Sequence, residues 1–407
     1  MISRTERQKA GITKWIKSGG KGTLVYATGV GKTWTAVQAI LLLLKTKPDA
    51  RIHIIVPTEV LREQWINDYI NKYQIASNCH VEIINSAIMH ESVCDLLVID
   101  EVHICGSEMF SKIFDAVTYD MILCLTATLE RLDGKEVIIK KNAPVCDIIS
   151  LQEAENAGWI SKVKQYLVLL DVDLTEYKNL DKKFNGYFAY FNWDYNCAML
   201  CMRDWKYRNS YAKQMGLSPK EVMAMASDWM RCLQKRKQFI SSHPKKIEVC
   251  KKILANRSDK KCITFSSTIK EAESLGLGMV LHSKQSKKKN KEIIDAFNSA
   301  KSAVLCTSKA ADVGVDIKGL SVGIIMSIDS SKIRKTQRIG RVCRFEAGKQ
   351  AEIFTLVIRG TQEQKWFNNS NTTDVTVLNE QQLDEILSGK NVETRKRDAI
   401  ADTMFRF

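Results

Sequence analysis

The sequence predicts an α/β protein that has two parallel-sheet domains and a helical insertion in the second. Short apolar runs alternate with helix-like segments over roughly the first 150 residues. The same alternation returns after residue 260, and residues 174–240, which lie between the two regions, carry no convincing strand. Strands that are separated by helices form parallel sheets with helices on both faces. The 407 residues also exceed the length of one ordinary domain.

The first domain is predicted to span residues 1–155. Its apolar runs are predicted strands, at residues 22–27, 51–56, 95–99 and 121–125. A glycine loop follows the first run and leads into a helix that is expected to reach Leu44. Strands that are joined in this way by helices lie parallel in one sheet.

The second domain is predicted to span residues 156–407. Its predicted strands lie at residues 261–266, 303–307, 322–326 and 351–356, with helical stretches at 245–254 and 291–297. From about Gly389 the chain is polar and basic, and this tail is expected to be loose.

The predicted helical insertion spans residues 174–240. Eleven of the 32 aromatic residues lie between Tyr177 and Tyr211, with lysine and arginine interleaved. These aromatic rings fit the core of a small helical subdomain. They also fit a surface on which the bases of a nucleic acid stack. The two interpretations are compatible, and the sequence leaves both open.

Composition favours a polyanionic partner. The chain has 61 Lys+Arg against 46 Asp+Glu, a net charge of +15. Such an excess fits nucleic acid, although solubility alone also explains it. No apolar run approaches the ~18–20 residues of a spanning helix, and no secretory leader is seen, so no membrane contact is expected. The 12 cysteines form no Cys-x-x-Cys pair, which predicts free thiols in a reducing cytoplasm and no zinc site.

A phosphate-binding loop is predicted between the first strand and the following helix, where residues 27–33 read A-T-G-V-G-K-T. Glycines let the backbone curl so that its N–H groups point at phosphates, and the helix start adds partial positive charge. Lys32 is expected to reach the β- and γ-phosphates, and Thr33 to offer its hydroxyl to Mg²⁺. The predicted cofactor-binding residues are Thr28, Gly29, Val30, Gly31, Lys32 and Thr33.

An acid pair follows the third predicted strand, in the sequence Asp100-Glu101-Val102-His103. The carboxyl end of a neighbouring parallel strand is where a ligand of Mg²⁺ belongs, so Asp100 is expected to hold the metal. Glu101 is expected to act as the general base that polarises the attacking water. Beside this site, His103 is predicted to be a coupling residue.

These motifs resemble those of superfamily 2 helicases, in the order found in that family. The first-domain motifs include the phosphate loop, Val56-Pro57-Thr58, the D-E-V-H box and Thr126-Ala127-Thr128. In the second domain, residues 307–317 are similar to motif V and residues 337–344, Q-R-I-G-R-V-C-R, to motif VI. Met109-Phe110 and Gly360-Thr361 resemble the XPB-like and phage UvsW-like DNA repair and recombination branch. The resemblance implies two RecA-like domains of the P-loop NTPase class, with a thumb-like insertion.

The resemblance also implies roles for single residues. Thr126 and Thr128 would link hydrolysis to domain movement. Arg341 and Arg344 would be arginine fingers, which stabilise charge on the γ-phosphoryl oxygens. Gln8 would contact adenine. Asp316 would contact the ribose or motif VI, and Gln337 would face the γ-phosphate.

Contacts with a nucleic-acid strand are implied on loops that face away from ATP. The residues are Pro57, Thr58, Ser266, Ser267, Ser308 and Lys309. Hydroxyls, backbone N–H groups and lysines suit phosphates, so binding is expected to be sequence-independent and salt-sensitive. Lysine-rich runs near residues 235–237, 245–252 and 284–289 are either part of this track or solvated faces.

The sequence thus predicts an ATP- and Mg²⁺-dependent DNA helicase or translocase. Its expected substrates are single-stranded, forked or branched DNA in repair, recombination, branch migration or replication, with replication or recombination proteins as partners. It is expected to be a cytoplasmic monomer, in the host cytoplasm if the chain comes from a phage. Leu132 stands where XPB-like proteins carry a glutamate, which leaves a duplex translocase open as an alternative. An RNA helicase and a nucleotide-gated DNA clamp are further alternatives.

Overall fold

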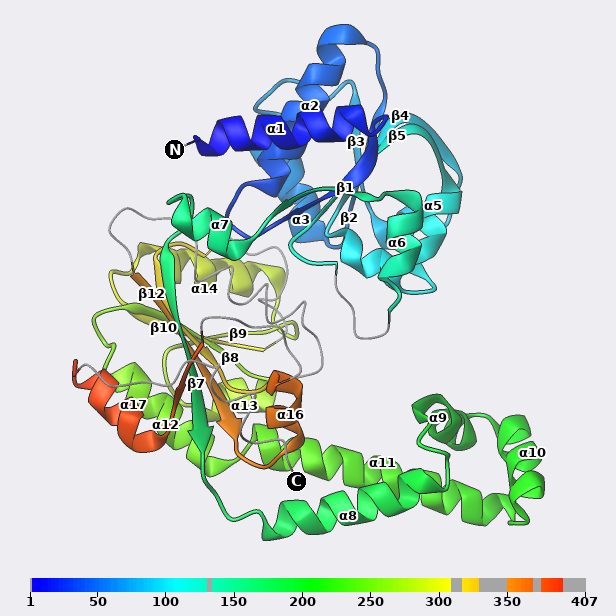
Figure 1. Ribbon diagram of the computed structural model, residues 1–407, viewed down its shortest axis with the longest axis vertical. Coiled ribbons are helices and arrows are strands. Elements are labelled where there is room, and N and C mark those ends of the chain that lie inside the picture. Colours follow the sequence, from blue (N-terminus) through cyan, green and yellow to red (C-terminus); the bar gives the residue numbers. More distant parts are fainter. Residues whose placement is uncertain (1, 130–133, 309–316, 329–349, 369–374, 391–407) are drawn as a thin grey trace.

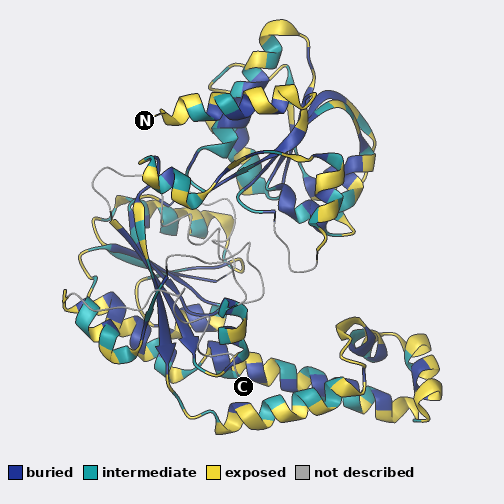
Figure 2. Ribbon diagram, viewed as in Figure 1, coloured by how far each residue is buried: buried dark blue, intermediate teal, exposed yellow. Residues whose placement is uncertain are grey.

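Two parallel sheets and a helical arm make up the molecule (Figure 1). The structure is a computed structural model, and it describes residues 2–129, 134–308, 317–328, 350–368 and 375–390. Figure 2 shows buried residues gathered in the strands and on the inner faces of the helices. No helix in these described ranges combines the length and the apolar character needed to cross a bilayer.

The first sheet has six strands in the order β3-β2-β4-β5-β1-β6, and every pairing is parallel. Successive residues of the central strand β4 alternate between two apolar cores. Leu96 and Val98 lie in one core, and Leu97 and Ile99 in the other. The strands are β1 (Lys21–Tyr26), β2 (Ile52–Val56), β3 (Cys79–Ile83), β4 (Ser92–Asp100), β5 (Val117–Thr126) and β6 (Val145–Ile149).

Helices cover both faces of this sheet (Figure 1). The α-helices are α1 (Arg4–Lys17), α2 (Lys32–Thr46), α3 (Glu59–Gln64), α4 (Ile84–Ala87), α5 (Ile113–Ala116), α6 (Glu136–Asn142) and α7 (Leu151–Asn156). Shorter helical turns are a π-helix, η1 (Trp65–Ile70), and two 3₁₀ turns, η2 (Val102–Gly106) and η3 (Phe110–Lys112).

A buried carboxylate fastens α1 to the sheet. Asp147 on β6 accepts hydrogen bonds from Arg7 at 2.5 Å, Lys14 at 2.6 Å and Tyr26 at 2.8 Å. Burial alone would raise the pKa of Asp147, but these three donors lower it below its usual range. The helix that precedes the phosphate loop is thereby held against the edge of the sheet.

The second sheet has seven parallel strands in the order β13-β7-β12-β11-β8-β10-β9. Its strands are β7 (Lys162–Leu170), β8 (Lys261–Phe265), β9 (Met279–Leu281), β10 (Ala303–Thr307), β11 (Leu320–Ile325), β12 (Gln350–Ile358) and β13 (Val375–Leu378). Its helices are α12 (Pro244–Ala255), α13 (Ile269–Ser274), α14 (Lys287–Ser299), α16 (Gln362–Asn368) and α17 (Glu380–Leu387).

The helical arm lies between β7 and α12 in the chain and projects from the second sheet (Figure 1). It consists of α8 (Thr175–Ala189), α9 (Tyr195–Arg203), α10 (Trp205–Met215) and α11 (Pro219–Ser241). Helices α8 and α11 run side by side and are joined by an ion pair of 2.7 Å between Arg236 and Asp181. Trp229 is fully buried in a separate apolar core of this arm.

The predicted fold class is confirmed, since both α/β sheets are parallel. The predicted apolar runs are strands of these sheets, within two residues at their ends except that β4 and β5 begin three and four residues earlier than predicted. Several further strands were not predicted: β3, β6, β7, β9 and β13. The predicted domain limits at residues 155 and 156 stay a prediction.

Candidate functional site

The predicted phosphate loop joins β1 to α2. Gly29 and Gly31 both have a φ of 92°, a left-handed conformation that glycine adopts without strain. A Cβ atom built on Gly31 would lie 2.8 Å from Nε2 of Gln8, so a side chain there would both strain the backbone and displace the end of Gln8. Lys32 begins α2, and its Nζ atom lies 3.5 Å from the carbonyl oxygen of Tyr26. The loop therefore has the backbone shape that the glycines predict.

Gln8 on α1 holds the phosphate loop in place by hydrogen bonds. Its side chain is almost fully buried, and Nε2 donates a hydrogen bond of 2.7 Å to the carbonyl oxygen of Val30. Oε1 accepts a hydrogen bond of 3.2 Å from Gln38 on α2. Gln8 thus holds the loop backbone in this structure, while its contact with adenine stays a prediction.

The acid pair lies at the carboxyl end of β4. Asp100 is buried, and its two oxygens accept hydrogen bonds from Trp65 Nε1 at 3.0 Å and from the Glu101 amide at 2.9 Å. Burial, together with the charge of Glu101, raises the pKa of Asp100 to about 6. Glu101 has a φ of 52°, which is uncommon for a residue with a side chain. The chain therefore turns sharply where the two carboxylates are placed.

His103 connects the acid pair to the next strand. Its Nδ1 atom lies 3.3 Å from Oε2 of Glu101 and 3.3 Å from the hydroxyl of Thr126, at the end of β5. Thr126 in turn donates a hydrogen bond of 2.7 Å to the carbonyl oxygen of Thr128. A continuous chain of polar contacts thus leads from Glu101 to the loop after β5.

The strand register brings these groups together at the end of the sheet where β1, β4 and β5 have their carboxyl ends. Asp100 of β4 is paired with Leu125 of β5, and Thr126 of β5 with Val25 of β1. The phosphate loop begins one residue after β1 ends. Lys32 lies near enough for its charge to act on Asp100. Oxygen ligands of this kind suit Mg²⁺, so the donor set fits that ion.

Several predicted site residues lie outside the described residues. These are Lys309, Asp316, Gln337, Arg341 and Arg344, together with the Arg131-Leu132-Asp133 stretch. The arginine fingers, the ribose contact and the γ-phosphate contact therefore stay predictions.

The predicted strand-binding residues differ in exposure. Thr58 is partly exposed and caps α3 through a hydrogen bond from the Leu61 amide, with Pro57 just before it. Ser266 and Ser308 are buried after β8 and β10, and the Ser267 amide donates to Glu271 at 2.8 Å. A buried hydroxyl does not reach a phosphate, so this geometry lends no support to side-chain contacts from Ser266 and Ser308.

Two of the lysine-rich runs contain structural members. Arg236 is buried against Asp181, with its guanidinium 4.2 Å from the centre of the Phe184 ring. Lys246 is fully buried in an ion pair of 2.7 Å with Glu363. Arg236 therefore stabilises the helical arm and Lys246 the second domain, and neither side chain is available to bind a nucleic-acid strand.

One contact of the site was not predicted. The bond from Trp65 to Asp100 depends on the π-helix that turns the indole inward. The Gln64-Trp65 pair in the sequence was the available signal, but its partner was not evident. Together, a glycine loop, an acid pair whose aspartate is buried, and a histidine beside the pair define a P-loop NTPase, with a second α/β domain beside it.

Comparison with known proteins identifies the family. Residues 2–93 match the family model described as "Type III restriction enzyme, res subunit", and residues 245–346 match "Helicase conserved C-terminal domain". These two matches, together with the XPB relatives described next, support an XPB-like superfamily 2 helicase, which is an ATP-dependent enzyme that acts on nucleic acid. The resemblance stated from the motifs is confirmed at this level.

Two relatives and one solved structure show how far the similarity extends. The chain is 26% identical over 389 residues to the DNA 3'-5' translocase XPB2 of Sulfurisphaera tokodaii, covering 89% of this chain and 83% of the relative. It is 23% identical to the DNA 3'-5' helicase XPB of Mycobacterium tuberculosis, covering 84% of this chain and 58% of that protein. S. cerevisiae Dbp5 bound to RNA and ADP BeF3 has the same fold, with a TM-score of 0.57, 14% identity and coverage of 94% and 91%.

Proposed function

We propose that the chain uses ATP hydrolysis with Mg²⁺ to move along DNA and to act on forked or branched substrates. The observation that carries this proposal is that Lys32, the acid pair and Thr126 lie together at the carboxyl ends of the strands in the first sheet. Both XPB relatives are named for DNA. A net charge of +15 agrees with a polyanionic substrate.

The proposed roles follow from the chemistry of each group. Lys32 contacts the β- and γ-phosphates, and Thr33 and Asp100 hold Mg²⁺, which neutralises charge on the phosphates. Glu101 accepts a proton from the attacking water. His103 then transmits the state of Glu101 to Thr126, through two contacts of 3.3 Å.

The second domain completes the reaction in this proposal. Arg341 and Arg344 stabilise the charge that develops on the γ-phosphoryl oxygens, with Gln337 nearby and Asp316 at the ribose. Because these groups belong to the other domain, hydrolysis would require the two domains to close. Closing and opening would then move two DNA grips relative to each other.

The helical arm offers a candidate surface for DNA. Trp193 and Trp205 are 59% and 63% exposed, whereas Trp229 is fully buried. The arm therefore combines an aromatic core with exposed rings near α9 and α10. We propose that the exposed rings stack on bases or lie against sugars.

Steady-state ATP hydrolysis tests the proposal. Turnover is measured without nucleic acid and with single-stranded DNA, forked DNA, duplex DNA or single-stranded RNA, and Lys32→Ala serves as the inactive control. The expected result is strong stimulation by DNA, greatest with forks. Greater stimulation by RNA than by DNA would identify RNA as the substrate. Absence of turnover with every nucleic acid would favour a DNA clamp.

A duplex translocase is the second candidate function. It is favoured by the Sulfurisphaera relative, which is named as a translocase, and by Leu132 in place of an acid. Strand displacement on a forked duplex separates the two. A helicase releases one DNA strand from the fork. A translocase hydrolyses ATP and displaces a protein bound to the DNA, but the two strands stay paired. A monomeric state, cytoplasmic action and replication or recombination partners remain part of the proposal.

A further inference from the structure

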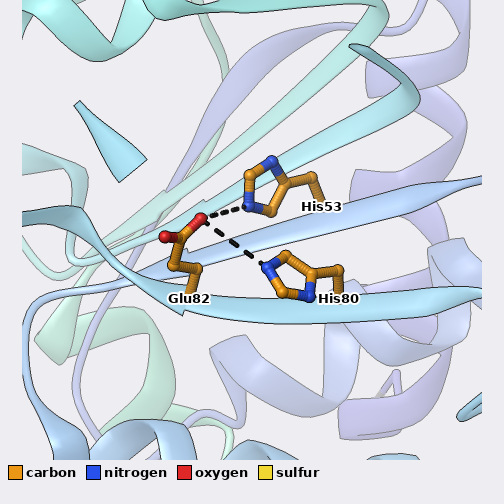
Figure 3. Close-up of side chains that lie close together, drawn as sticks. All are labelled: His53, His80 and Glu82. Carbon is orange, nitrogen blue, oxygen red and sulfur yellow. Dashed lines mark hydrogen bonds and ion pairs between the residues drawn. The ribbon is translucent and has the colours of Figure 1, made fainter. Parts of the chain in front are cut away.

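Three histidines lie around one carboxylate near the amino ends of β2, β3 and β4, in the first sheet. His53 lies on β2, and His80 and Glu82 lie on the edge strand β3. The parallel register places His53 directly beside His80, and Glu82 follows two residues later on the same face. His90 reaches the same carboxylate from the segment before β4. Figure 3 shows His53, His80 and Glu82 pointing toward one another.

The spacing of these atoms fits a small tetrahedral metal ion. The Nε2 atoms of His53, His80 and His90 lie 3.2, 3.6 and 3.4 Å from Oε2 of Glu82. Around Zn²⁺, with ligand bonds of about 2.0–2.2 Å, neighbouring ligand atoms are about 3.3–3.6 Å apart. The potential ligand atoms of His53, His80 and Glu82 all lie within 4.8 Å of one another. His90 lies outside that group of three, although its exposed ring contacts the same carboxylate, so the ring would have to move to become a fourth ligand.

The most buried histidine is already oriented for this role. Nδ1 of His53 lies 3.2 Å from the hydroxyl of Ser92, which leaves Nε2 directed at Glu82. Metal-bound histidines commonly use their second nitrogen in this way.

The ligand set also selects the metal. Imidazole nitrogens suit Zn²⁺, Cu²⁺ and Ni²⁺, whereas Mg²⁺ and Ca²⁺ prefer oxygen ligands. Cys79 and Cys94 line the same cavity, but the group of ligand atoms that lie within 4.8 Å of one another consists of the two imidazoles of His53 and His80 and the carboxylate of Glu82. The cysteine pattern predicted no zinc site, because that prediction concerned only sites in which cysteines take part.

We propose that His53, His80, His90 and Glu82 form a Zn²⁺ site that fastens the edge of the first sheet. The ion would join β2, the edge strand β3 and the segment that enters β4. An edge strand has hydrogen-bond partners on one side only, so a metal link adds stability where the sheet has least. This site is distinct from the nucleotide site, which lies at the opposite ends of the strands. The proposal does not depend on the substrate of the motor.

Zinc binding to the 407-residue chain without an affinity tag tests the proposal. The metal-depleted protein is titrated with Zn²⁺ against a chromophoric chelator, and Co²⁺ spectra report tetrahedral coordination. We expect one tightly bound Zn²⁺ per chain and a rise in melting temperature on binding. His80→Ala and Glu82→Gln should each weaken binding at least about tenfold. His80 is 70% exposed, so this variant is expected to fold normally.

Glu273→Gln is the matched control. Glu273 is also paired with a histidine, His282 at 3.6 Å, but that carboxylate has a single imidazole beside it among the described contacts. This variant should bind Zn²⁺ as the unaltered chain does. Equal affinity in His80→Ala, Glu82→Gln and Glu273→Gln would show that any zinc is held elsewhere and would overturn the proposal. Absence of binding by the unaltered chain would overturn it as well.

Discussion

The first sheet has polar clusters at both ends of its strands, and the two clusters differ in origin. At the carboxyl ends, Lys32, Asp100 and Glu101 come from short motifs in which the residues are neighbours in sequence. At the amino ends, His53 and His80 come from separate strands and meet because the register places them side by side. A motif can be read from the sequence, whereas a cluster made by register cannot. The same sheet therefore contains one site that is apparent in the sequence and one that is hidden.

The two clusters also differ in the ions that they suit. The carboxyl-end cluster offers oxygen atoms, which fit Mg²⁺ beside a nucleotide. The amino-end cluster offers three imidazoles around Glu82, which fit Zn²⁺. If the assignment is correct, changes at one end should impair turnover, and changes at the other should impair metal binding. Variants that separate these effects test the comparison.

The largest effect is expected from Glu101→Gln. The amide keeps the size of the side chain but removes the general base, so ATP turnover should fall roughly 10²–10⁴-fold. Binding of ATP should be retained, because Lys32 and the loop are unchanged. Steady-state hydrolysis and equilibrium nucleotide binding measure the two quantities.

Glu82→Gln is the corresponding change at the other end of the sheet. It should weaken Zn²⁺ binding and keep the ATP turnover of the unaltered chain, while Glu101→Gln should keep the Zn²⁺ affinity. Loss of turnover in both variants would show that the two clusters do not act separately. Full turnover in Glu101→Gln would remove the glutamate from the mechanism.

In the first sheet, the strands that the sequence predicts are those with continuous apolar runs. β4 and β5 are central and buried on both faces, so nearly every residue in their inner halves is apolar. The edge strands β3 and β6 were not predicted, since each carries polar residues with partners that only the folded chain supplies. In β3 these are His80 and Glu82, and in β6 it is Asp147.

The same distinction applies within the nucleotide site. The glycines, Lys32 and the acid pair were predicted because each acts through its own backbone or a nearby residue. The bond from Trp65 to Asp100 and the bond from Gln8 to Val30 join segments that are distant in sequence. Contacts of this kind depend on how helices pack on the sheet, which residue spacing does not encode.

An intermediate effect is expected from Gln8→Ala. The substitution leaves the buried carbonyl oxygen of Val30 without its 2.7 Å donor and opens space beneath Gly31. An unsatisfied buried polar group costs about 1–3 kcal/mol, so the free energy of unfolding should fall by about that amount, and ATP affinity should also fall because the loop loses its support. Gln38→Ala removes only the donor to Gln8 and should have a smaller effect. Equal affinity in the unaltered chain and in Gln8→Ala would show that the loop keeps its shape without this support.

The smallest effect is expected from His103→Ala, which interrupts the path from Glu101 to Thr126. Each contact is 3.3 Å long, and a single hydrogen bond of this kind contributes about 0.5–1.5 kcal/mol. Turnover in the presence of DNA should therefore fall about 2- to 10-fold, with ATP affinity unchanged. Because His103 would couple hydrolysis to domain movement, the stimulation by DNA should fall more than the basal rate. An equal reduction in both rates would assign His103 a role in placing Glu101 alone. Zn²⁺ affinity should not change in this variant, since His103 lies at the carboxyl end of the sheet, away from His53 and His80.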